Sequence, residues 1–368
     1  MYFIYILFHF QMLYNSFNKR VFGETGFVIG KEDDVKKVGI IGCGNIARVH
    51  GWVIQNMKDA ELVAVCDTEP GKAEELSEEY AGGKAEVYTD WHALCEAEAD
   101  VVHICTPHFL HAPMAAELLR HGKSVFMEKP CAISREQFEG LKKEDRSHPG
   151  KLGFCFQNRY NKTTLEMDRM LAEGKIGEVK GARAFVTWRR DEAYYVGSQW
   201  KGRWMTEGGG ALINQSVHTL DLLLRYFGRP EQVAASLSNH HLQGLIEVED
   251  TVEAWMSFAQ GGRACFYASN GYAADAPVFL ELEGERGRIT MNGSRLTLWT
   301  PEKGVEEYPC ESGHGIGKDY WGCGHRSCIN DFYRCLEEGR SYQGNLSGVE
   351  NTFDTMMRIY EAAGKAPR

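Results

Sequence analysis

The first half of the chain alternates short apolar runs with segments whose apolar residues recur at helical spacing. The apolar runs predict strands over residues 38–41, 62–66, 86–88, 101–105, 124–127 and 152–156. The segments between them predict helices that end near residue 56 and that cover residues 70–80, 91–96, 111–120 and 134–143. Such alternation predicts a doubly wound parallel sheet, in which ligands bind beyond the carboxyl ends of the strands.

From residue 178 onward the pattern changes to longer runs in which apolar and polar residues alternate. These predict strands over residues 179–188, 232–238, 251–258, 263–268, 278–283, 287–291 and 295–300, with turns such as Asn292-Gly293 between some of them. Helical patterns cover residues 163–172, 210–227, 327–338 and 348–363. We expect an α+β domain with a large, mostly antiparallel open sheet that helices cover on one side.

The length of 368 residues favours two domains, because a single core rarely grows that large. The change of pattern places them at residues 35–156 and 157–368. Residues 1–34 are expected to be a leader outside the fold. Their apolar stretch is too short to span a bilayer, and Lys19 and Arg20 follow it instead of preceding it as in a signal peptide.

Composition narrows the function. Hydrophobic and charged residues make up 43% and 25% of the chain, which are globular values, and the net charge of −10 argues against a nucleic-acid partner. The first six of the eleven cysteines fall on or beside the predicted parallel strands and their helices, as free thiols do in a reducing compartment. We therefore expect a cytoplasmic protein with no membrane partner. Cys323, His325, Cys328 and Cys335 match no zinc spacing, so no metal is expected.

A glycine turn follows the first apolar run and opens the first helix. Gly42 allows the tight turn, Gly44 lets the backbone approach a pyrophosphate, and the helix start at Asn45 and Ile46 offers N–H groups to phosphate. Asp67 ends the second run, 23 residues after Gly44, where a carboxylate can accept hydrogen bonds from the adenosine ribose. Because it would repel a 2′-phosphate, NAD is favoured over NADP; the alternative is that Asp67 is a turn residue. This half therefore predicts a Rossmann domain.

Three segments leave predicted strands at the edge where a nicotinamide ring and a substrate would meet. They contribute Thr106 and Pro107, then Glu128 and Lys129, and then Asn158.

A second polar group lies on the predicted helix over residues 210–227. Asn214, His218, Asp221 and Arg225 recur at helical spacing beside an apolar stripe, directly after the glycines at 208–210. Those glycines would let a ligand or another backbone come close. The alternative is an amphipathic helix with a solvated face.

Together these residues resemble the glucose–fructose oxidoreductase / inositol dehydrogenase / rhizopine-catabolism family over residues 35–363. The resemblance rests on the glycine turn, on Cys105-Thr106-Pro107 with His111, on Glu128-Lys129-Pro130, and on the glycines at 208–210 with Asn214 and His218. It implies a Rossmann domain, a second domain whose open sheet forms homodimer or homotetramer contacts, and a cis Lys129–Pro130 bond. It also implies that Lys129 and His218 line the reacting carbon.

The residues suit the oxidation of a secondary alcohol, which needs a base for the hydroxyl proton. A positive nicotinamide would lower the pKa of Lys129, and His218 can share the proton. Many relatives carry aspartate at the position of Asn214. Asparagine can orient a hydroxyl but carries no charge, which makes Lys129 the better candidate for the base. The competing interpretations are a lysine paired with Glu128 and a satisfied core histidine.

The predicted function is an NAD-dependent dehydrogenase that acts on a secondary hydroxyl of a cyclitol, sugar or sugar derivative. Substrate contacts are expected from Arg159, Tyr160, Trp200, Arg203 and Trp204, although the last three could belong to a loop packed by its own tryptophans. Two alternatives from the same superfamily are a glycosidase with no net redox change and a non-enzymatic sugar or cofactor sensor.

Overall fold

The computed structural model describes residues 35–310 and 322–365. The proposed leader at 1–34 lies outside the described residues. The N-terminal part forms a six-stranded sheet in the order β3-β2-β1-β4-β5-β6, and every pairing in it is parallel. Its strands are β1 (Lys36–Ile41), β2 (Ala60–Cys66), β3 (Glu86–Tyr88), β4 (Val101–Ile104), β5 (Ser124–Met127) and β6 (Leu152–Phe154). The predicted doubly wound sheet is confirmed.

Helices flank this sheet as the alternation predicts. They are α2 (Asn45–Gln55), α3 (Pro70–Ala81), α4 (Ala93–Glu96), α5 (His108–Arg120) and α6 (Arg135–Ser147). The strand order reverses between β1 and β4, which is where this fold leaves a crevice for a ligand. The buried runs of β1, β4 and β5 are covered on both faces, as parallel strands require.

The second part is an eight-stranded sheet in the order β14-β13-β12-β11-β7-β10-β9-β8, antiparallel except where β10 pairs with β7. Its strands are β7 (Val179–Thr187), β8 (Gln232–Ser238), β9 (Thr251–Ser257), β10 (Arg263–Ser269), β11 (Phe279–Gly284), β12 (Arg288–Asn292), β13 (Arg295–Thr300) and β14 (Gly304–Pro309). The last strand is additional to those the sequence predicts. It is an edge strand whose residues alternate between half-buried and exposed, so it carries a weak apolar pattern.

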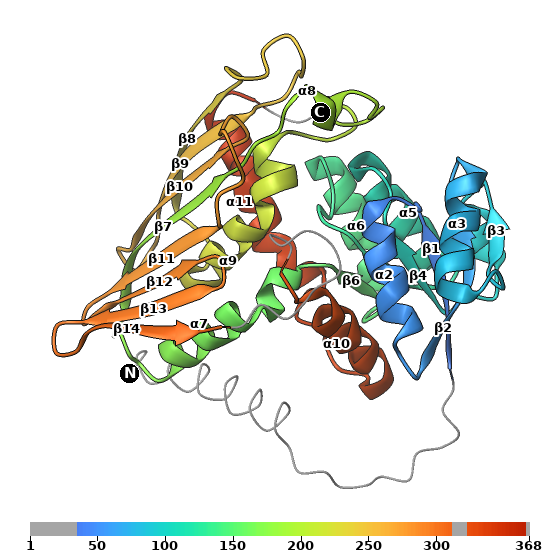
Figure 1. Ribbon diagram of the computed structural model, residues 1–368, viewed down its shortest axis with the longest axis horizontal. Helices are drawn as coiled ribbons and strands as arrows, with labels where there is room; N and C mark the ends of the chain where they lie inside the picture. Colours follow the sequence, from blue (N-terminus) through green and yellow to red (C-terminus); the bar gives the residue numbers. More distant parts are fainter. Residues whose placement is uncertain (1–34, 311–321, 366–368) are drawn as a thin grey trace, which may run out of the picture.

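Helices cover one face of this sheet, the one turned toward the N-terminal domain (Figure 1). They are α7 (Lys162–Ala172), α9 (Val217–Phe227) and α11 (Leu346–Ala362), while the short η1 (Gln157–Tyr160) and α8 (Glu192–Tyr195) lie in the connections. The continuous helix predicted over residues 210–227 is wrong in its first part: residues Ala211–Ser216 form a π-helix, η2, and the α-helix begins at Val217.

One late helix crosses back to the first domain. Helix α10 (His325–Glu338) starts two residues earlier than the sequence predicts and packs on α2 and η1. Its Cys328, Phe332 and Tyr333 share a buried cluster with Val38 and Phe126 of the parallel sheet. The core beside the glycine turn is therefore built from both ends of the chain.

All eleven cysteines lie within the described residues and are free, and the first six are buried, which confirms that they form no disulfide framework. Among the helices of residues 35–310 and 322–365, none is long and apolar enough to cross a membrane.

Candidate active site

The glycine turn between β1 and α2 leaves room for a phosphate. Gly42 has a positive φ of 85°, and a Cβ there would lie 2.7 Å from the Cys105 carbonyl oxygen, so only glycine fits between the two strand ends. A Cβ at Gly44 would meet nothing within 4 Å, and no side chain caps the start of α2. The exposed N–H groups at Asn45 and Ile46 and the positive end of the helix thus face open space, which fits the pyrophosphate of a dinucleotide.

Asp67 lies at the end of β2 with its carboxylate toward this turn. Its Oδ2 accepts from the Cys43 backbone N–H at 2.8 Å, and its Oδ1 accepts from that of Glu69 at 2.9 Å. The contact with Glu69 is what the alternative interpretation of Asp67, as a turn residue, predicts. Each carboxylate oxygen keeps a further lone pair, so the ribose-binding role remains compatible with the geometry.

His111 joins two of the predicted cofactor loops. Its Nδ1 lies 2.8 Å from the Pro130 carbonyl oxygen, and its Nε2 lies 2.8 Å from that of Thr106. The ring is buried, and both nitrogens are engaged by the backbone. The structure therefore places His111 between the loops that carry Thr106 and Lys129, where it holds their spacing instead of presenting a ring nitrogen to a cofactor.

The other predicted cofactor residues lie at the carboxyl ends of the strands. Pro107 immediately precedes α5, and Thr106 directs its hydroxyl to the Met114 sulfur at 3.6 Å. Asn158 lies half-buried in η1, where its Oδ1 accepts from Asn161 at 3.3 Å.

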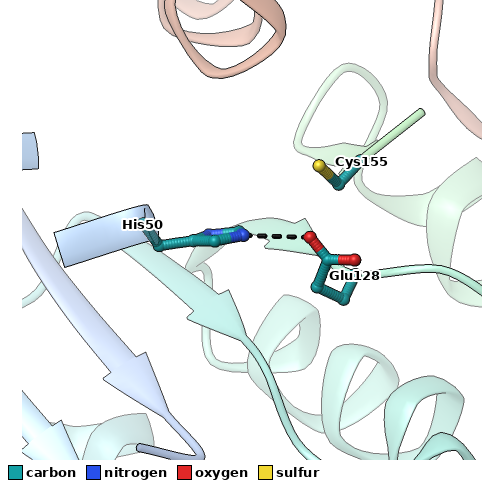
Figure 2. A group of neighbouring side chains, drawn as sticks. All are labelled: His50, Glu128 and Cys155. Atoms are coloured by element: carbon teal, nitrogen blue, oxygen red, sulfur yellow. Dashed lines mark hydrogen bonds and ion pairs between the residues drawn. The ribbon is translucent and has the colours of Figure 1, made fainter. Parts of the chain in front are cut away.

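Glu128 is buried and bonded to a histidine that sequence analysis did not single out. Its Oε1 lies 3.0 Å from His50 Nε2, and the dashed line in Figure 2 marks this contact. Burial by itself would raise the pKa of Glu128, but the hydrogen bond and charge of His50 outweigh it and hold that pKa below its usual value. The carboxylate is thus ionised, and the contact with His50 ties it to α2 through one oxygen.

A chain of hydrogen bonds continues behind this pair. His50 Nδ1 lies 2.7 Å from His103 Nδ1, and His103 Nε2 lies 3.0 Å from the Tyr333 hydroxyl of α10. One proton assignment satisfies all three contacts: Tyr333 donates to His103, His103 donates to His50, and His50 donates to Glu128. The chain links α10 to the strand end that carries Lys129.

Cys155 completes a group that Figure 2 draws beside this pair. Its Sγ, His50 and Glu128 offer ligand atoms within 4.8 Å of one another, a spacing that metal sites share. Burial raises the pKa of the Cys155 thiol, however, which disfavours the thiolate that a metal needs.

Lys129 lies at the centre of the site. It follows β5, its bond to Pro130 is cis as the resemblance implies, and its Nζ donates to the Asn214 carbonyl oxygen at 2.9 Å and lies 3.4 Å from Asn214 Oδ1. Burial lowers its pKa, while the charges of Glu128 and Glu207 oppose that shift. The two predicted halves of the site therefore meet through Lys129 and Asn214.

The π-helix explains why this contact forms. Glu249 accepts from the N–H groups of Gly210 and Leu212 at 2.9 and 3.0 Å and fixes the first turn of η2. A π-turn changes the backbone hydrogen-bond pattern, and the Asn214 carbonyl oxygen is presented to Lys129. The glycines serve protein packing: a Cβ at Gly209 would lie 1.9 Å from the Tyr360 hydroxyl, and one at Gly210 would lie 2.0 Å from the Glu249 carbonyl oxygen.

His218 is half-buried on the next turn and packs edge-on against Phe156, with ring centroids 5.5 Å apart. Its Nδ1 is buried with no hydrogen-bond partner among the described residues, so it is not the satisfied core histidine of the competing interpretation. Burial, and then the charge of Lys129, hold the pKa of His218 well below its usual value. The ring is neutral at physiological pH.

Comparison with known proteins agrees with this geometry. Residues 36–154 match the oxidoreductase family with an NAD-binding Rossmann fold, and residues 164–290 match the GFO/IDH/MocA C-terminal domain. The chain belongs to the Gfo/Idh/MocA oxidoreductase family.

Individual relatives are dehydrogenases. The chain is 26% identical to inositol 2-dehydrogenase of Rhizobium meliloti over 70% of its own length and 76% of that protein. It is 32% identical to D-glucoside 3-dehydrogenase of Escherichia coli over 56% of its own length and 58% of that protein. Among solved structures, the WlbA dehydrogenase of Bordetella pertussis in complex with NADH and UDP-GlcNAcA is 26% identical, with a TM-score of 0.77 over 90% of this chain and 97% of that one. This protein is thus an NAD-binding oxidoreductase of the sugar and cyclitol dehydrogenase type.

Two expected substrate residues of this Gfo/Idh/MocA oxidoreductase have other partners. Arg159 is buried and binds both carboxylate oxygens of Asp221, at 2.7 and 2.5 Å. Tyr160 donates to Asp331 at 2.7 Å. Both side chains bind other elements of the same domain, α9 and α10, in place of the expected substrate. Asp221 is therefore not part of the ligand-facing stripe either.

The aromatic loop is divided between packing and the site. Trp204 donates from Nε1 to the Glu247 carbonyl oxygen at 3.0 Å and packs on Tyr360 of α11, so it is held by segments outside its own loop. Trp200 lies against the ring of His108 with centroids 4.7 Å apart, which places it beside the cofactor loops. Arg203 is exposed.

Three further residues lie near Lys129; of these, the sequence pointed only to His108, which stands with Thr106 and Pro107 in a strand-end segment. Glu207 is fully buried and bonds to Asn214, His108 is buried with Nδ1 2.8 Å from the Glu207 carbonyl oxygen, and His325 lies at the start of α10. Burial lowers the pKa of His325 to about 4, and the charge of Lys129 contributes. Glu207 directly precedes the glycines, which is the signal that the sequence offered for it. His325 reaches the site only because α10 packs back on α2 and η1, which no local pattern predicts.

Proposed function

We propose that this enzyme oxidises a secondary hydroxyl of a cyclitol, sugar or sugar derivative with NAD, and that Lys129 takes the hydroxyl proton. The observation that carries the proposal is the contact of Lys129 Nζ with Asn214, which joins the end of β5 to the π-helix of the second domain. The glycine turn and Asp67 lie at the ends of the neighbouring strands β1 and β2, so a dinucleotide held there reaches the same edge.

The residues of the site have different roles because they differ in charge and in the ability to accept a proton. NAD, when bound, supplies the hydride acceptor. Burial lowers the pKa of Lys129, which favours the neutral amine that can accept a proton. Asn214 can orient the hydroxyl but cannot take its proton. His218 is neutral and its buried Nδ1 has no hydrogen-bond partner among the described residues, which supports a role in sharing the proton.

The substrate class follows from the relatives and from the aromatic loop. The similar proteins named above act on inositol and on a D-glucoside, and Trp200 and Tyr194 offer aromatic faces beside the site. Aromatic faces with neighbouring cationic and amide donors suit a polyol ring.

The test is a screen of NAD and NADP reduction with inositols, hexoses, methyl glucosides and uronates, run together with release of an aryl group from aryl glycosides. Net NADH formation is expected with at least one polyol. Lys129→Met should lower kcat by roughly 10³-fold, the scale of general-base catalysis, while NADH binding measured by fluorescence is retained. Lys151→Met is the control, because that lysine also donates to a backbone carbonyl, that of Gly122 at 2.7 Å, but at the opposite end of the sheet. Aryl release without net NADH, or full activity in Lys129→Met, would overturn the proposal.

We also propose that the face of the large sheet without helices contacts a second copy of the chain. Trp255 is 64% exposed on this face, and the stacked rings of Phe185 and Phe279 lie half-buried there. In light scattering after size exclusion, the wild type should be a dimer or tetramer and Trp255→Glu should shift it to smaller species. A monomeric wild type would remove this part of the proposal. The free buried thiols support a reducing, cytoplasmic setting.

A further inference from the structure

Glu207 is a buried carboxylate in direct contact with the residue that contacts Lys129. It shows no exposed surface and lies one residue before the glycines. Its Oε1 accepts from Asn214 Nδ2 at 2.5 Å, and its Oε2 accepts from the backbone N–H of Gly202. Both oxygens therefore point at donors, as an ionised carboxylate requires.

The neighbours of Asn214 determine which way its amide points. The NH₂ group faces the Glu207 carboxylate, and the carbonyl oxygen Oδ1 faces the Lys129 ammonium at 3.4 Å. The flipped amide would place donor against donor at Lys129 and acceptor against acceptor at Glu207. Only one orientation satisfies both neighbours, and Glu207 makes the shorter contact.

We propose that Glu207 is a positioning residue for Lys129: its carboxylate fixes the amide of Asn214 with Oδ1 toward the lysine and supplies the negative charge that an asparagine lacks. The proposal rests on the proposed function in so far as Lys129 is the base. In this proposal Glu207, which lies outside the strand-end motifs, has the role that a carboxylate at position 214 would have.

The electrostatics agree with this geometry. The charge of Glu207 raises the pKa of Lys129 against the lowering by burial. Burial in turn raises the pKa of Glu207 to about 7, against the hydrogen bonds from Gly202 and Asn214. The other titratable groups that act on it or feel its charge are Glu249, Lys201, Tyr195 and Tyr360, and His108 contacts its carbonyl oxygen. Of these, only Glu249 also has a pKa raised to about 7.

A consequence follows for pH. Above about pH 7 the ionised Glu207 satisfies both donors and holds the amide in place. Below about pH 7 the carboxyl of Glu207 is protonated, and its O–H is then a third donor beside the amide of Asn214 and the backbone N–H of Gly202. The oriented form of Asn214 should therefore gain population as pH rises through the neutral range.

The decisive variant is Glu207→Gln, which keeps the size of the side chain and removes its charge. Glu249→Gln is the matched control: Glu249 is also buried, and Gly210, Leu212 and Tyr360 all donate to its Oε1, an acceptor that glutamine keeps, so the start of η2 is preserved and Asn214 loses no partner. The primary readout is the pKa of Lys129, from competitive labelling with acetic anhydride followed by mass spectrometry, which needs neither cofactor nor substrate. Glu207→Gln should lower that pKa by about one unit, the scale of a lost neighbouring charge, and Glu249→Gln should leave it unchanged.

Kinetics and binding supply the second readout. With any polyol that the wild type oxidises, Glu207→Gln should lose roughly tenfold in kcat, flatten the limb of the pH profile near neutrality, and change NADH affinity little. In an Asn214→Ala background, the same substitution should cause a much smaller loss of kcat, because the amide through which Glu207 acts is gone.

Several outcomes would overturn the inference. It is wrong if Glu207→Gln leaves the pKa of Lys129 unchanged, or if Glu249→Gln shifts it equally. If Glu207→Gln fails to fold, labelling of wild-type Lys129 decides: a second inflection near pH 7 is expected, and a single-step profile contradicts the inference. A shifted pKa in an enzyme that oxidises no polyol would retain this inference and remove the proposed function instead.

Discussion

At the scale of single residues, the site depends on opposing effects on one amine. Burial lowers the pKa of Lys129, and the charges of Glu128 and Glu207 raise it. A lysine held only by burial would lose its proton too easily to return it, and a lysine held only by carboxylates would not accept one near neutrality. The two carboxylates come from different domains, so the balance exists only when the domains are in place.

Asp67 should determine the choice between the two nicotinamide cofactors. Asp67→Ser removes the charge that repels a 2′-phosphate, and we expect the ratio of kcat/KM for NAD to that for NADP to fall by roughly tenfold or more. Because Asp67 also accepts from Cys43 and Glu69, Asp67→Asn is measured in parallel to keep one acceptor oxygen. An unchanged ratio in both variants would reduce Asp67 to its turn role.

At the scale of elements, the π-helix η2 is the feature on which the site depends. Glu249 holds its start, and the Ser216 hydroxyl bonds the Ala211 carbonyl oxygen at 2.7 Å near its end. The segment begins immediately after the glycines, where Tyr360 and the Glu249 backbone leave no room for a side chain. Packing against α11 and β9 thus determines the helix type that presents Asn214.

Gly209→Ala should therefore be strongly destabilising. Its φ is 152° and its Cβ would overlap the Tyr360 hydroxyl, so we expect a loss of more than about 3 kcal/mol in the free energy of unfolding. Gly71→Ala in α3 is the control, because its Cβ would meet nothing within 4 Å, and alanine there should be neutral or stabilise by up to about 1 kcal/mol. Urea unfolding measures both, and equal effects would contradict the argument.

Arg159 should stabilise the contact between elements and not the substrate. It joins η1 to Asp221 of α9 and donates to the Gln343 and Gly348 carbonyl oxygens before and within α11. Arg159→Met leaves the Asp221 carboxylate buried without its cation, and we expect a loss of about 3–5 kcal/mol. The double variant with Asp221→Leu should recover part of it. A large rise in KM with unchanged stability would restore the substrate role.

At the scale of the whole molecule, the last helices of the chain pack against the N-terminal domain. Helix α10 returns to pack on α2 and brings Tyr333 into the hydrogen-bond chain that ends at Glu128. Helix α11 lies between the large sheet and the N-terminal domain (Figure 1). Among the described residues five histidines and several carboxyls are buried, so stability must depend on pH.

The stability difference between Glu249→Gln and wild type isolates one of these groups. Burial raises the pKa of Glu249 to about 7 from 4.5. The contribution of a group with a raised pKa is fully present below pH 4.5 and is lost as pH rises toward 7. Glutamine does not ionise, so the variant has no such loss. Its free energy of unfolding should therefore increase relative to that of the wild type by up to about 3 kcal/mol across this pH range. The buried histidines make the free energy of unfolding rise with pH, and they do so equally in the wild type and the variant. Urea unfolding of both proteins at the same pH therefore isolates the effect of Glu249. A constant difference would show that Glu249 ionises normally.

The sequence by itself determined the elements and much of the site. The resemblance to the family implied that Lys129 and the segment around Asn214 and His218 meet. Period-two and helical patterns, glycine turns and strand-end residues are local, so the parallel sheet and the strands of the second sheet apart from β14 could be predicted from the residues themselves. These features depend on neighbours a few residues apart or on the rule that parallel strands end at one edge.

Only the tertiary structure decided which polar residues bind protein. Arg159 and His111 resembled ligand contacts in sequence, yet distant carbonyls and Asp221 occupy them. Glu207 received no role from the sequence, yet it is buried and its carboxylate accepts from Asn214. The physical reason is that burial and long-range hydrogen bonding depend on what packs against a side chain, and residues far apart in the chain supply that packing here.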